Sequence, residues 1–216
     1  MTRSELGRAL LSLLAPNRCP FCGGIVGAFE YWHERCYIAL REYDGAEPVP
    51  EGLSALTAPY VYEGAVRAAL LRYKGGPLGC YAEPFALIMA ERIGKVQADM
   101  LVPVPSRFSS TLERGFQPAV RLARRLSRVC GVRCVSALGV RDGAEQKRLR
   151  AQARRENAGG AFFVRRPKTV AGKRVLIIDD ICTTGSTLSA CARILREAGA
   201  ADVDGAVFAR TLSSRK

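Results

Sequence analysis

The stretch VLIIDDICTTGST, residues 175–187, decides the fold of this 216-residue chain. Its first four residues are apolar without polar alternation, a pattern typical of a strand that is covered on both faces of a sheet. Two adjacent carboxylates follow, and a run of small hydroxyl residues with one glycine then opens a helix expected over 186–198. A buried strand that leads directly into a helix indicates a parallel α/β sheet.

The segments on either side repeat the alternation of strand and helix. Residues 100–105 form an apolar run that ends in prolines, which suits a buried strand that leaves the edge of the sheet. A helix pattern follows, and Gly131 is placed to end it. Its apolar face is expected to comprise Phe116, Ala119, Val120, Ala123, Leu126 and Val129. Further strands are expected at 134–135, 160–164 and 202–209. This alternation predicts an α/β domain over residues 46–216, with a parallel sheet flanked by helices.

The residues after the buried strand have the chemistry to bind a phosphorylated sugar. Asp179 and Asp180 have the reach to accept hydrogen bonds from two vicinal ribose hydroxyls, directly or through water on Mg²⁺. Free N–H groups of small residues at a helix N-terminus favour a phosphate. The candidate phosphate-binding residues are Thr183, Thr184, Gly185, Ser186 and Thr187. Adjacent acids after a strand also occur as simple caps, so the prediction depends on the arrangement as a unit.

A second motif lies near the N-terminus, where Cys19 and Cys22 are followed by His33 and Cys36. Two pairs, each with two intervening residues, are typical of a tetrahedral zinc site, and the only histidine of the chain completes the set. A redox Cys-x-x-Cys pair normally opens a helix, whereas prolines and glycines frame a turn here. A disulfide framework is disfavoured in a cytoplasmic chain. Four protein ligands predict a closed, structural Zn²⁺ in a small module over residues 1–45.

Segment 1–15 of this module reads as a capped amphipathic helix rather than a signal peptide, because its apolar run is short and Pro16 follows at once. No stretch is long and apolar enough to span a bilayer, so we expect a cytoplasmic protein. The other cysteines lie among apolar residues without ligand spacing and are interpreted as small core residues. They are Cys80, Cys130, Cys134, Cys182 and Cys191.

As a unit, residues 175–187 resemble the binding signature for phosphoribosyl pyrophosphate (PRPP) of type I phosphoribosyltransferases, with Cys182 at a usually aliphatic position. Together with the Cys/His motif, the chain resembles the ComF family, also described as competence protein F or GntX-like. The likeness includes the segments Tyr62-Glu63-Gly64, Arg72-Tyr73-Lys74-Gly75, Val102-Pro103-Val104-Pro105, Glu113-Arg114-Gly115-Phe116 and Arg154-Arg155-Glu156-Asn157.

The resemblance implies two further loops around the ligand. A pyrophosphate-binding loop would run from Pro103 to Gly115, and a basic loop that closes over the substrate would span 141–157. A departing pyrophosphate needs Mg²⁺ and cations beside it, although any single arginine also fits a solvated face. The candidate cations are Arg107, Arg114, Lys147, Arg148 and Arg150.

Three positions depart from related proteins. Purine phosphoribosyltransferases resemble this segment but carry an aspartate where Thr183 stands, and a threonine cannot accept a proton at neutral pH. An orotate-like or other nitrogen nucleophile, or no catalysis, is therefore favoured over purine salvage. His33 stands where many ComF relatives have a fourth cysteine, and Gln117 stands where an asparagine is common, which leaves the contacts made there open.

The chain carries a formal net charge of +13, which favours polyanionic partners, although an arginine-rich genome would give the same composition. The ComF resemblance implies a role in natural competence, with single-stranded DNA and DNA-uptake or recombination proteins as partners. Only 16 residues are aromatic, so an extended base-stacking platform is not evident. We therefore expect a PRPP- and Mg²⁺-binding protein acting in DNA uptake; the alternatives are an active phosphoribosyltransferase and a PRPP-sensing regulator.

Overall fold

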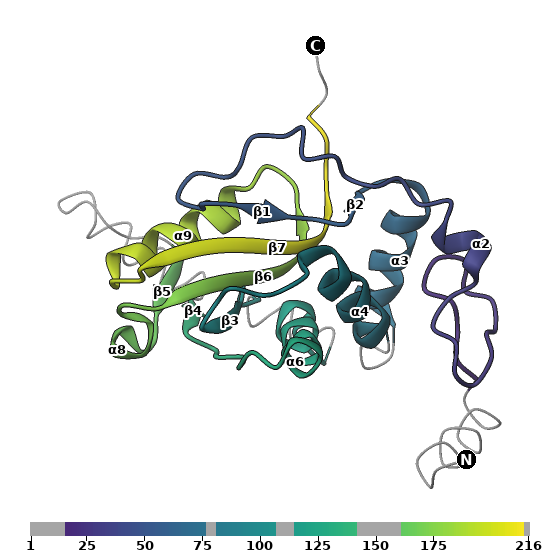
Figure 1. Cartoon of the computed structure of the whole chain (residues 1–216), viewed down its shortest axis with the longest axis horizontal. Coiled ribbons are helices and arrows are strands. Elements are labelled where there is room, and N and C mark those ends of the chain that lie inside the picture. Colours follow the sequence, from purple (N-terminus) through teal and green to yellow (C-terminus); the bar gives the residue numbers. More distant parts are fainter. Residues whose placement is uncertain (1–15, 77–80, 107–114, 142–160, 214–216) are drawn as a thin grey trace, which may run out of the picture.

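The computed structural model describes residues 16–76, 81–106, 115–141 and 161–213. Its main sheet comprises the parallel strands β1 (Leu56–Thr57), β2 (Tyr60–Val61), β3 (Met100–Pro103), β6 (Arg174–Cys182) and β7 (Asp202–Arg210). The strand order is β1-β7-β6-β3, and β2 also pairs with β7, near its carboxyl end. Figure 1 shows β6 and β7 crossing the centre of the molecule. The predicted parallel α/β fold is confirmed.

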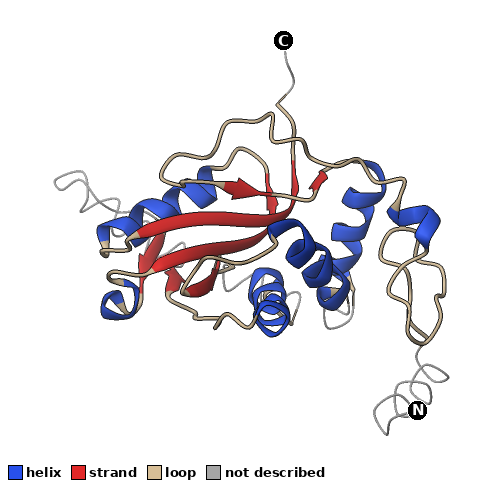
Figure 2. Ribbon diagram, in the orientation of Figure 1, coloured by secondary structure: helices blue, strands red, loops and turns tan. Residues whose placement is uncertain are grey.

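Helices cover both faces of the sheet (Figure 2). One face carries α3 (Gly64–Gly75), α4 (Ala82–Ile93) and α6 (Pro118–Cys130), and the other carries α9 (Ser186–Glu197) and the short α8 (Pro167–Val170). Successive residues of a strand point to opposite faces, so β6 contributes to both cores. Leu176 and Ile178 join the core under α3, α4 and α6, whereas Val175 and Ile177 join the core under α9. The uniform apolarity of this strand is explained because neither face meets water.

Helix α6 ends where it was predicted to end, but it begins after Phe116, and its buried face differs in part from the predicted one. Pro118 begins the helix, and Gly131 ends it with a left-handed φ of 72°. Leu122 is fully buried, although it was not assigned to the apolar face, whereas Val129 is 40% exposed. The buried stripe runs through Ala119, Leu122, Ala123 and Leu126, and Val129 lies at its edge in the last turn, where it is not covered.

The weak strand predicted at 134–135 is reduced to a single bridge beside β3. Cys134 makes only an isolated parallel bridge to Leu101, and the next strand is β4 (Leu138–Val140). Strand β5 (Phe162–Val164) pairs antiparallel with β4 in a separate two-stranded sheet, so neither strand extends the parallel sheet. A strand of three apolar residues does not indicate which strand it pairs with. The strand predicted at 160–164 was therefore assigned to the parallel sheet, which is wrong.

Residues 46–100 were left without assigned elements, yet they form β1, β2, α3 and α4. The amphipathic signal of this region is weak because α4 is apolar on most of its surface and packs against both α6 and β7. The helix predicted within segment 1–15 lies outside the described residues. In the part of the chain that the structure describes, no helix is long and apolar enough to cross a membrane.

Candidate functional site

The two aspartates lie within β6 rather than after it, because the strand continues to Cys182. Asp179 is aligned with Val207 of β7 at the carboxyl end of the sheet, where ligands of parallel α/β sheets bind. Strand alternation directs Asp180 to the face of α3 and Asp179 to the face of α9. The structure therefore places both acids at one sheet edge, with their side chains on opposite faces.

Asp180 is buried and forms an ion pair with a helix that the sequence had not connected to the site. The Nζ atom of Lys74, in the last turn of α3, lies 2.8 Å from Asp180 Oδ2. Sequence reasoning missed Lys74 as a site residue, although the segment 72–75 was one of those that carried the family resemblance. Its contact with Asp180 shows why a lysine is needed there: it neutralises a carboxylate that has little access to water.

Asp179 has an unusual electrostatic environment. Removal from water and the neighbouring Asp180 carboxylate raise the pKa of Asp179 well above its ordinary value, against the opposing effect of the Asp180 backbone amide and Lys74. The Asp180 N–H donates to Asp179 Oδ1 over 2.9 Å. Among the described residues, Lys74 is the one cation paired with these two adjacent acids, a charge imbalance that favours a further cation or hydrogen-bond donor.

The phosphate-loop candidates directly follow β6. Thr183 and Thr184 are exposed, and Gly185 adopts a left-handed φ of 80° immediately before α9 begins at Ser186. A Cβ atom at Gly185 would lie 2.8 Å from Cγ of Pro50, so glycine is needed for both its conformation and the close approach. The hydroxyls of Thr184 and Ser186 lie 3.0 Å apart, and the Ser186 N–H donates to Thr184 Oγ1 over a long 3.4 Å. Gly185, the residue before α9, supplies no side-chain cap for the N–H groups that follow.

This loop forms one wall of a cavity of about 780 Å³. Thr183, Thr184, Ser186 and Ser189 line one side. The opposite sides consist of residues 47–51, which cross over the loop, and residues 210–213 after and at the end of β7. Sequence reasoning did not find these walls, because nothing in residues 47–51 indicates that they cross the carboxyl end of the sheet.

The four predicted metal ligands are brought together by the fold. One ligand atom from each of Cys19, Cys22, His33 and Cys36 lies within 4.8 Å of the others. Tetrahedral zinc, with bonds of about 2.3 Å to sulfur and about 2.0 Å to nitrogen, places ligand atoms roughly 3.5–4 Å apart. The donor set and its spacing therefore fit Zn²⁺.

The surroundings of this Cys/His cluster also fit a metal. His33 Nε2 lies 3.0 Å from the carbonyl oxygen of Ile25, which leaves Nδ1, 3.2 Å from Cys22 Sγ, as the ligand atom. Burial would raise the pKa of Cys19, but hydrogen bonds from the His33 and Cys22 backbone outweigh it and lower that pKa to about 7. Burial and the neighbouring Cys22 and Cys19 raise the pKa of Cys36 to about 11, a repulsion that a bound cation removes.

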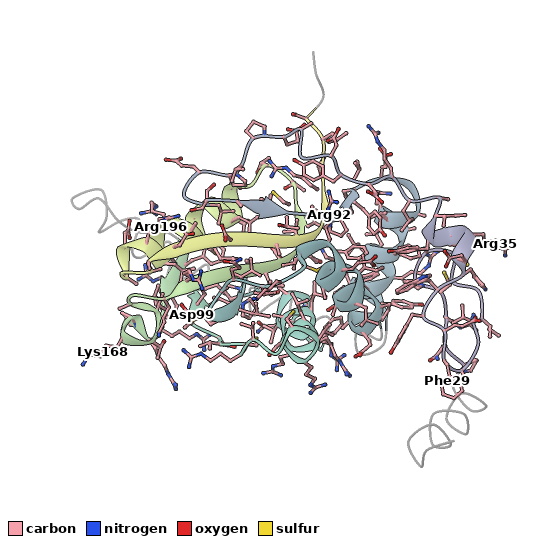
Figure 3. All side chains as sticks on the ribbon, in the orientation of Figure 1. Phe29, Arg35, Arg92, Asp99, Lys168 and Arg196 are labelled. Carbon is pink, nitrogen blue, oxygen red and sulfur yellow. The ribbon has the colours of Figure 1, made fainter. Side chains whose placement is uncertain are left out.

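The cluster is anchored to the larger core. Cys19, Phe21 and Val26 belong to the same hydrophobic core as Tyr73 and Phe85. The guanidinium of Arg72, on α3, donates to the carbonyl oxygens of Pro20 and Phe21 over 3.0 and 2.9 Å. The outer side of the cluster faces away from this core, and Figure 3 shows Phe29 and Arg35 pointing outward from it. The boundary after residue 45 stays a prediction.

A basic groove beside the pyrophosphate-loop candidate was not predicted as a site. It has a volume of about 570 Å³ and is lined by Arg121, Arg124, Arg125 and Arg128 of α6, by Arg165, and by Pro103 and Pro105. None of the described residues that line it is acidic. The sequence did show arginines on the polar face of α6, but not that Arg165 completes the groove.

The remaining predicted site residues and cysteines divide into two groups. Arg107, Arg114, Lys147, Arg148, Arg150 and Cys80 lie outside the described residues. Cys182 and Cys191 are buried, and burial raises the pKa of Cys191 to about 12, as expected for unreactive core thiols. Cys130 and Cys134 are half-buried near the end of α6.

Comparison with known proteins identifies the class. The phosphoribosyl transferase domain family matches residues 95–216, and the chain belongs to this family. Within it, the chain is 35% identical over 129 residues to "DNA utilization protein YhgH" of Salmonella typhimurium, covering 58% of this chain and 56% of that protein. It is 29% identical over 148 residues to "Competence protein ComFC" of Streptococcus pneumoniae, covering 68% and 64%.

These relatives confirm the resemblance to the ComF family. The chain spans between half and two thirds of the length of the curated relatives it matches. Among solved structures, a glutamine PRPP amidotransferase from B. subtilis is 21% identical with a TM-score of 0.42, covering 57% of this chain and 25% of that chain.

Proposed function

We propose that this chain binds PRPP with Mg²⁺ and acts in the uptake or use of DNA. The observation that carries the ligand assignment is the carboxyl end of β6, where Asp179 and Asp180 lie near the end of the strand, before the exposed loop Thr183-Thr184 and the N-terminus of α9. The acids accept hydrogen bonds from the ribose hydroxyls, and the N–H groups of 183–187 bind the 5′-phosphate. Lys74 holds Asp180 in place. Mg²⁺, when bound, neutralises charge on the pyrophosphate.

The test is a calorimetric titration of PRPP with Mg²⁺ into the wild type and an Asp179→Asn/Asp180→Asn variant. We expect saturable binding by the wild type and a loss of at least tenfold in affinity in the variant. Asp204→Asn, a matched change on β7 outside the cavity and the acid pair, should bind as the wild type does. Absence of binding by folded wild type would refute the assignment, and binding would justify a screen of acceptor amines and non-purine bases for turnover.

We further propose that the Cys/His cluster holds a structural Zn²⁺. Four protein ligands leave no open position for substrate, and the backbone contacts of His33 and Arg72 fix the cluster in place. Metal analysis of protein purified without chelator should return about one equivalent of zinc. A value under about half an equivalent contradicts the site.

The basic groove on α6 supports a second function, the binding of single-stranded DNA. Arg124 and Arg128 are exposed, and Figure 3 shows nitrogen-tipped side chains extending outward from α6. Arg121 lies over the Phe116 ring at 5.3 Å, and its buried Nη1 atom has no hydrogen-bond partner among the described residues. Five arginines line the groove, and no acidic residue of the described chain does. This positive charge is complementary to a phosphodiester backbone. The relatives' names refer to DNA utilization and competence.

Fluorescence anisotropy with a labelled single-stranded oligonucleotide at several salt concentrations tests this surface. Arg124→Glu/Arg128→Glu should weaken binding and reduce the slope of log K against log salt by about 1.4, two contacts at about 0.7 each. Arg67→Glu/Arg193→Glu makes the same charge change on α3 and α9 and should leave the slope unchanged. Affinity that does not respond to salt, or equal effects of both variants, would contradict a specific groove.

A further inference from the structure

One buried arginine has no charged partner in the part of the chain described by the structure. Arg210, the last residue of β7, is 5% exposed, and no carboxylate of a described residue forms an ion pair with it. Its Nη2 atom donates to the Pro48 carbonyl oxygen over 2.5 Å, and its guanidinium lies 5.8 Å from the centre of the Tyr43 ring. Its Nε atom is buried without a partner.

A second unsatisfied group lies next to it. Thr211 Oγ1 is buried, and no described residue forms a hydrogen bond with it. The Thr211 N–H donates to the Cys182 carbonyl oxygen over 3.0 Å and fixes the backbone there. Both Arg210 and Thr211 line the 780 Å³ cavity whose opposite wall is the loop Thr183, Thr184 and Ser186. Arg210 and Thr211 therefore line one cavity with the hydroxyls of the loop, and each has one buried polar atom without a hydrogen-bond partner among the described residues.

A buried cation without a counter-ion is strongly disfavoured, and one carbonyl and one aromatic ring do not replace its hydration. The strap of residues 47–51 carries two acids that also line the cavity, Glu47 and Glu51, but neither forms an ion pair with Arg210 among the described residues. Both carboxylate oxygens of Glu47 accept hydrogen bonds from Ser213. A planar guanidinium with free N–H groups is the side chain best suited to bind a phosphate or carboxylate. The missing partner is therefore an oxyanion.

We propose that Arg210 and Thr211 form an oxyanion subsite in this cavity, which binds a phosphate or carboxylate group of a ligand. The inference deepens the proposed function, because the group has two possible sources. It is either the 5′-phosphate of the phosphoribosyl ligand or the acidic group of a second ligand that binds beside it. In both cases Arg210 supplies the positive charge for the bound anion, because the loop 183–187 contains no cationic side chain.

The first probe is inorganic phosphate, titrated by calorimetry into the wild type, Arg210→Met, Arg210→Lys and Thr211→Val. We expect the wild type to bind, Arg210→Met to lose at least tenfold, and the other two to lose less. In phosphate-free buffer, the Tm of Arg210→Met should equal or exceed that of the wild type, because an unpaired buried charge is removed. Arg210→Lys and Thr211→Val keep the test valid if Arg210→Met does not fold.

Arg196 is the matched control. It donates to the Gly52 carbonyl oxygen over 2.6 Å and pairs with Asp202 at 3.0 Å, at the surface end of α9 (Figure 3). Arg196→Met should therefore lower Tm and leave phosphate affinity unchanged. If Arg210→Met behaves in the same way, Arg210 is a structural residue and the proposal is wrong. A wild type that does not bind phosphate also overturns it.

Two further measurements distinguish the sources. If Arg210→Met loses affinity for PRPP with Mg²⁺ in parallel with phosphate, the subsite holds the 5′-phosphate. If PRPP affinity is kept and binding of orotate, a planar carboxylate probe, to the PRPP-loaded protein is lost, the subsite serves a second ligand. If the wild type does not bind PRPP, while phosphate binds to the wild type and to the Asp179→Asn/Asp180→Asn variant, the proposed function is wrong. The oxyanion subsite is then retained.

Discussion

Replacement of Lys74 by methionine removes the one described cation that pairs with the acid pair while keeping the length of the side chain. Asp180 would then be left as a carboxylate whose side chain is only 9% exposed, beside Asp179. Loss of one partner costs about 3–5 kcal/mol in a fully buried ion pair and about 0–1 kcal/mol in an exposed one. The Lys74 side chain is 30% exposed, between these limits. We therefore expect a loss of about 2 kcal/mol.

For a chain of this size, 1 kcal/mol corresponds to about 2–4 °C in Tm, so Lys74→Met should lower Tm by roughly 4–8 °C. Thermal unfolding followed by circular dichroism measures this shift, and Lys95→Met, an exposed lysine outside the site, is the control. In an Asp180→Asn background the same Lys74 change should cost less than about half as much, because no charge is left unpaired. Equal costs in the two backgrounds would refute the pairing as the source of the effect.

Three further predictions concern the acid pair, the phosphate loop and the Cys/His cluster. Asp179→Asn should raise Tm at neutral pH. A carboxyl whose pKa is raised by folding contributes stability at low pH that is lost as pH rises through the native pKa, so the Tm difference from the wild type should grow as the pH rises above the ordinary pKa of an aspartate. Gly185→Ala should lower the free energy of unfolding by more than Gly131→Ala does. Both glycines have a positive φ, but only at Gly185 would the added Cβ contact Pro50. Equal losses would show that the chain relieves the contact between the added Cβ and Pro50 at no cost. Cys36→Ser should lower both Tm and the zinc content. Cys130→Ser, outside the Cys/His cluster, should change neither the zinc content nor the loss of zinc to a chelator.

The sequence was most informative where residue type follows directly from local geometry. The apolar run 175–178 predicted a strand covered on both faces, because any polar residue there would be buried. The spacing of Cys19, Cys22, His33 and Cys36 predicted their convergence, because two short turns suffice to bring the ligands together. These features are set by interactions within a few residues, so they are visible without a structure.

The parts that were missed depend on contacts between distant segments. Lys74 and Asp180 are 106 positions apart by their numbering, and a lysine at the end of a helix has many uses on a surface. The antiparallel pairing of β4 with β5 depends on tertiary context, since each strand has only three residues. The strap over the phosphate loop is likewise set by Pro50 packing against Gly185, a contact between residues far apart in the chain.

The carboxyl ends of β6 and β7 combine features that oppose folding. Asp179 has a raised pKa, Asp180 is a buried carboxylate with one lysine, and Arg210 is a buried cation without a described counter-ion. Such conflicts between electrostatics and burial are expected where a ligand completes the charge balance. If so, PRPP with Mg²⁺ should raise Tm by more than phosphate alone, because it supplies partners to both strand ends; at a ligand concentration of 100 times Kd the gain is about 2.7 kcal/mol. Stabilisation by phosphate but not by PRPP would separate the two strand ends and assign the cavity to a different ligand.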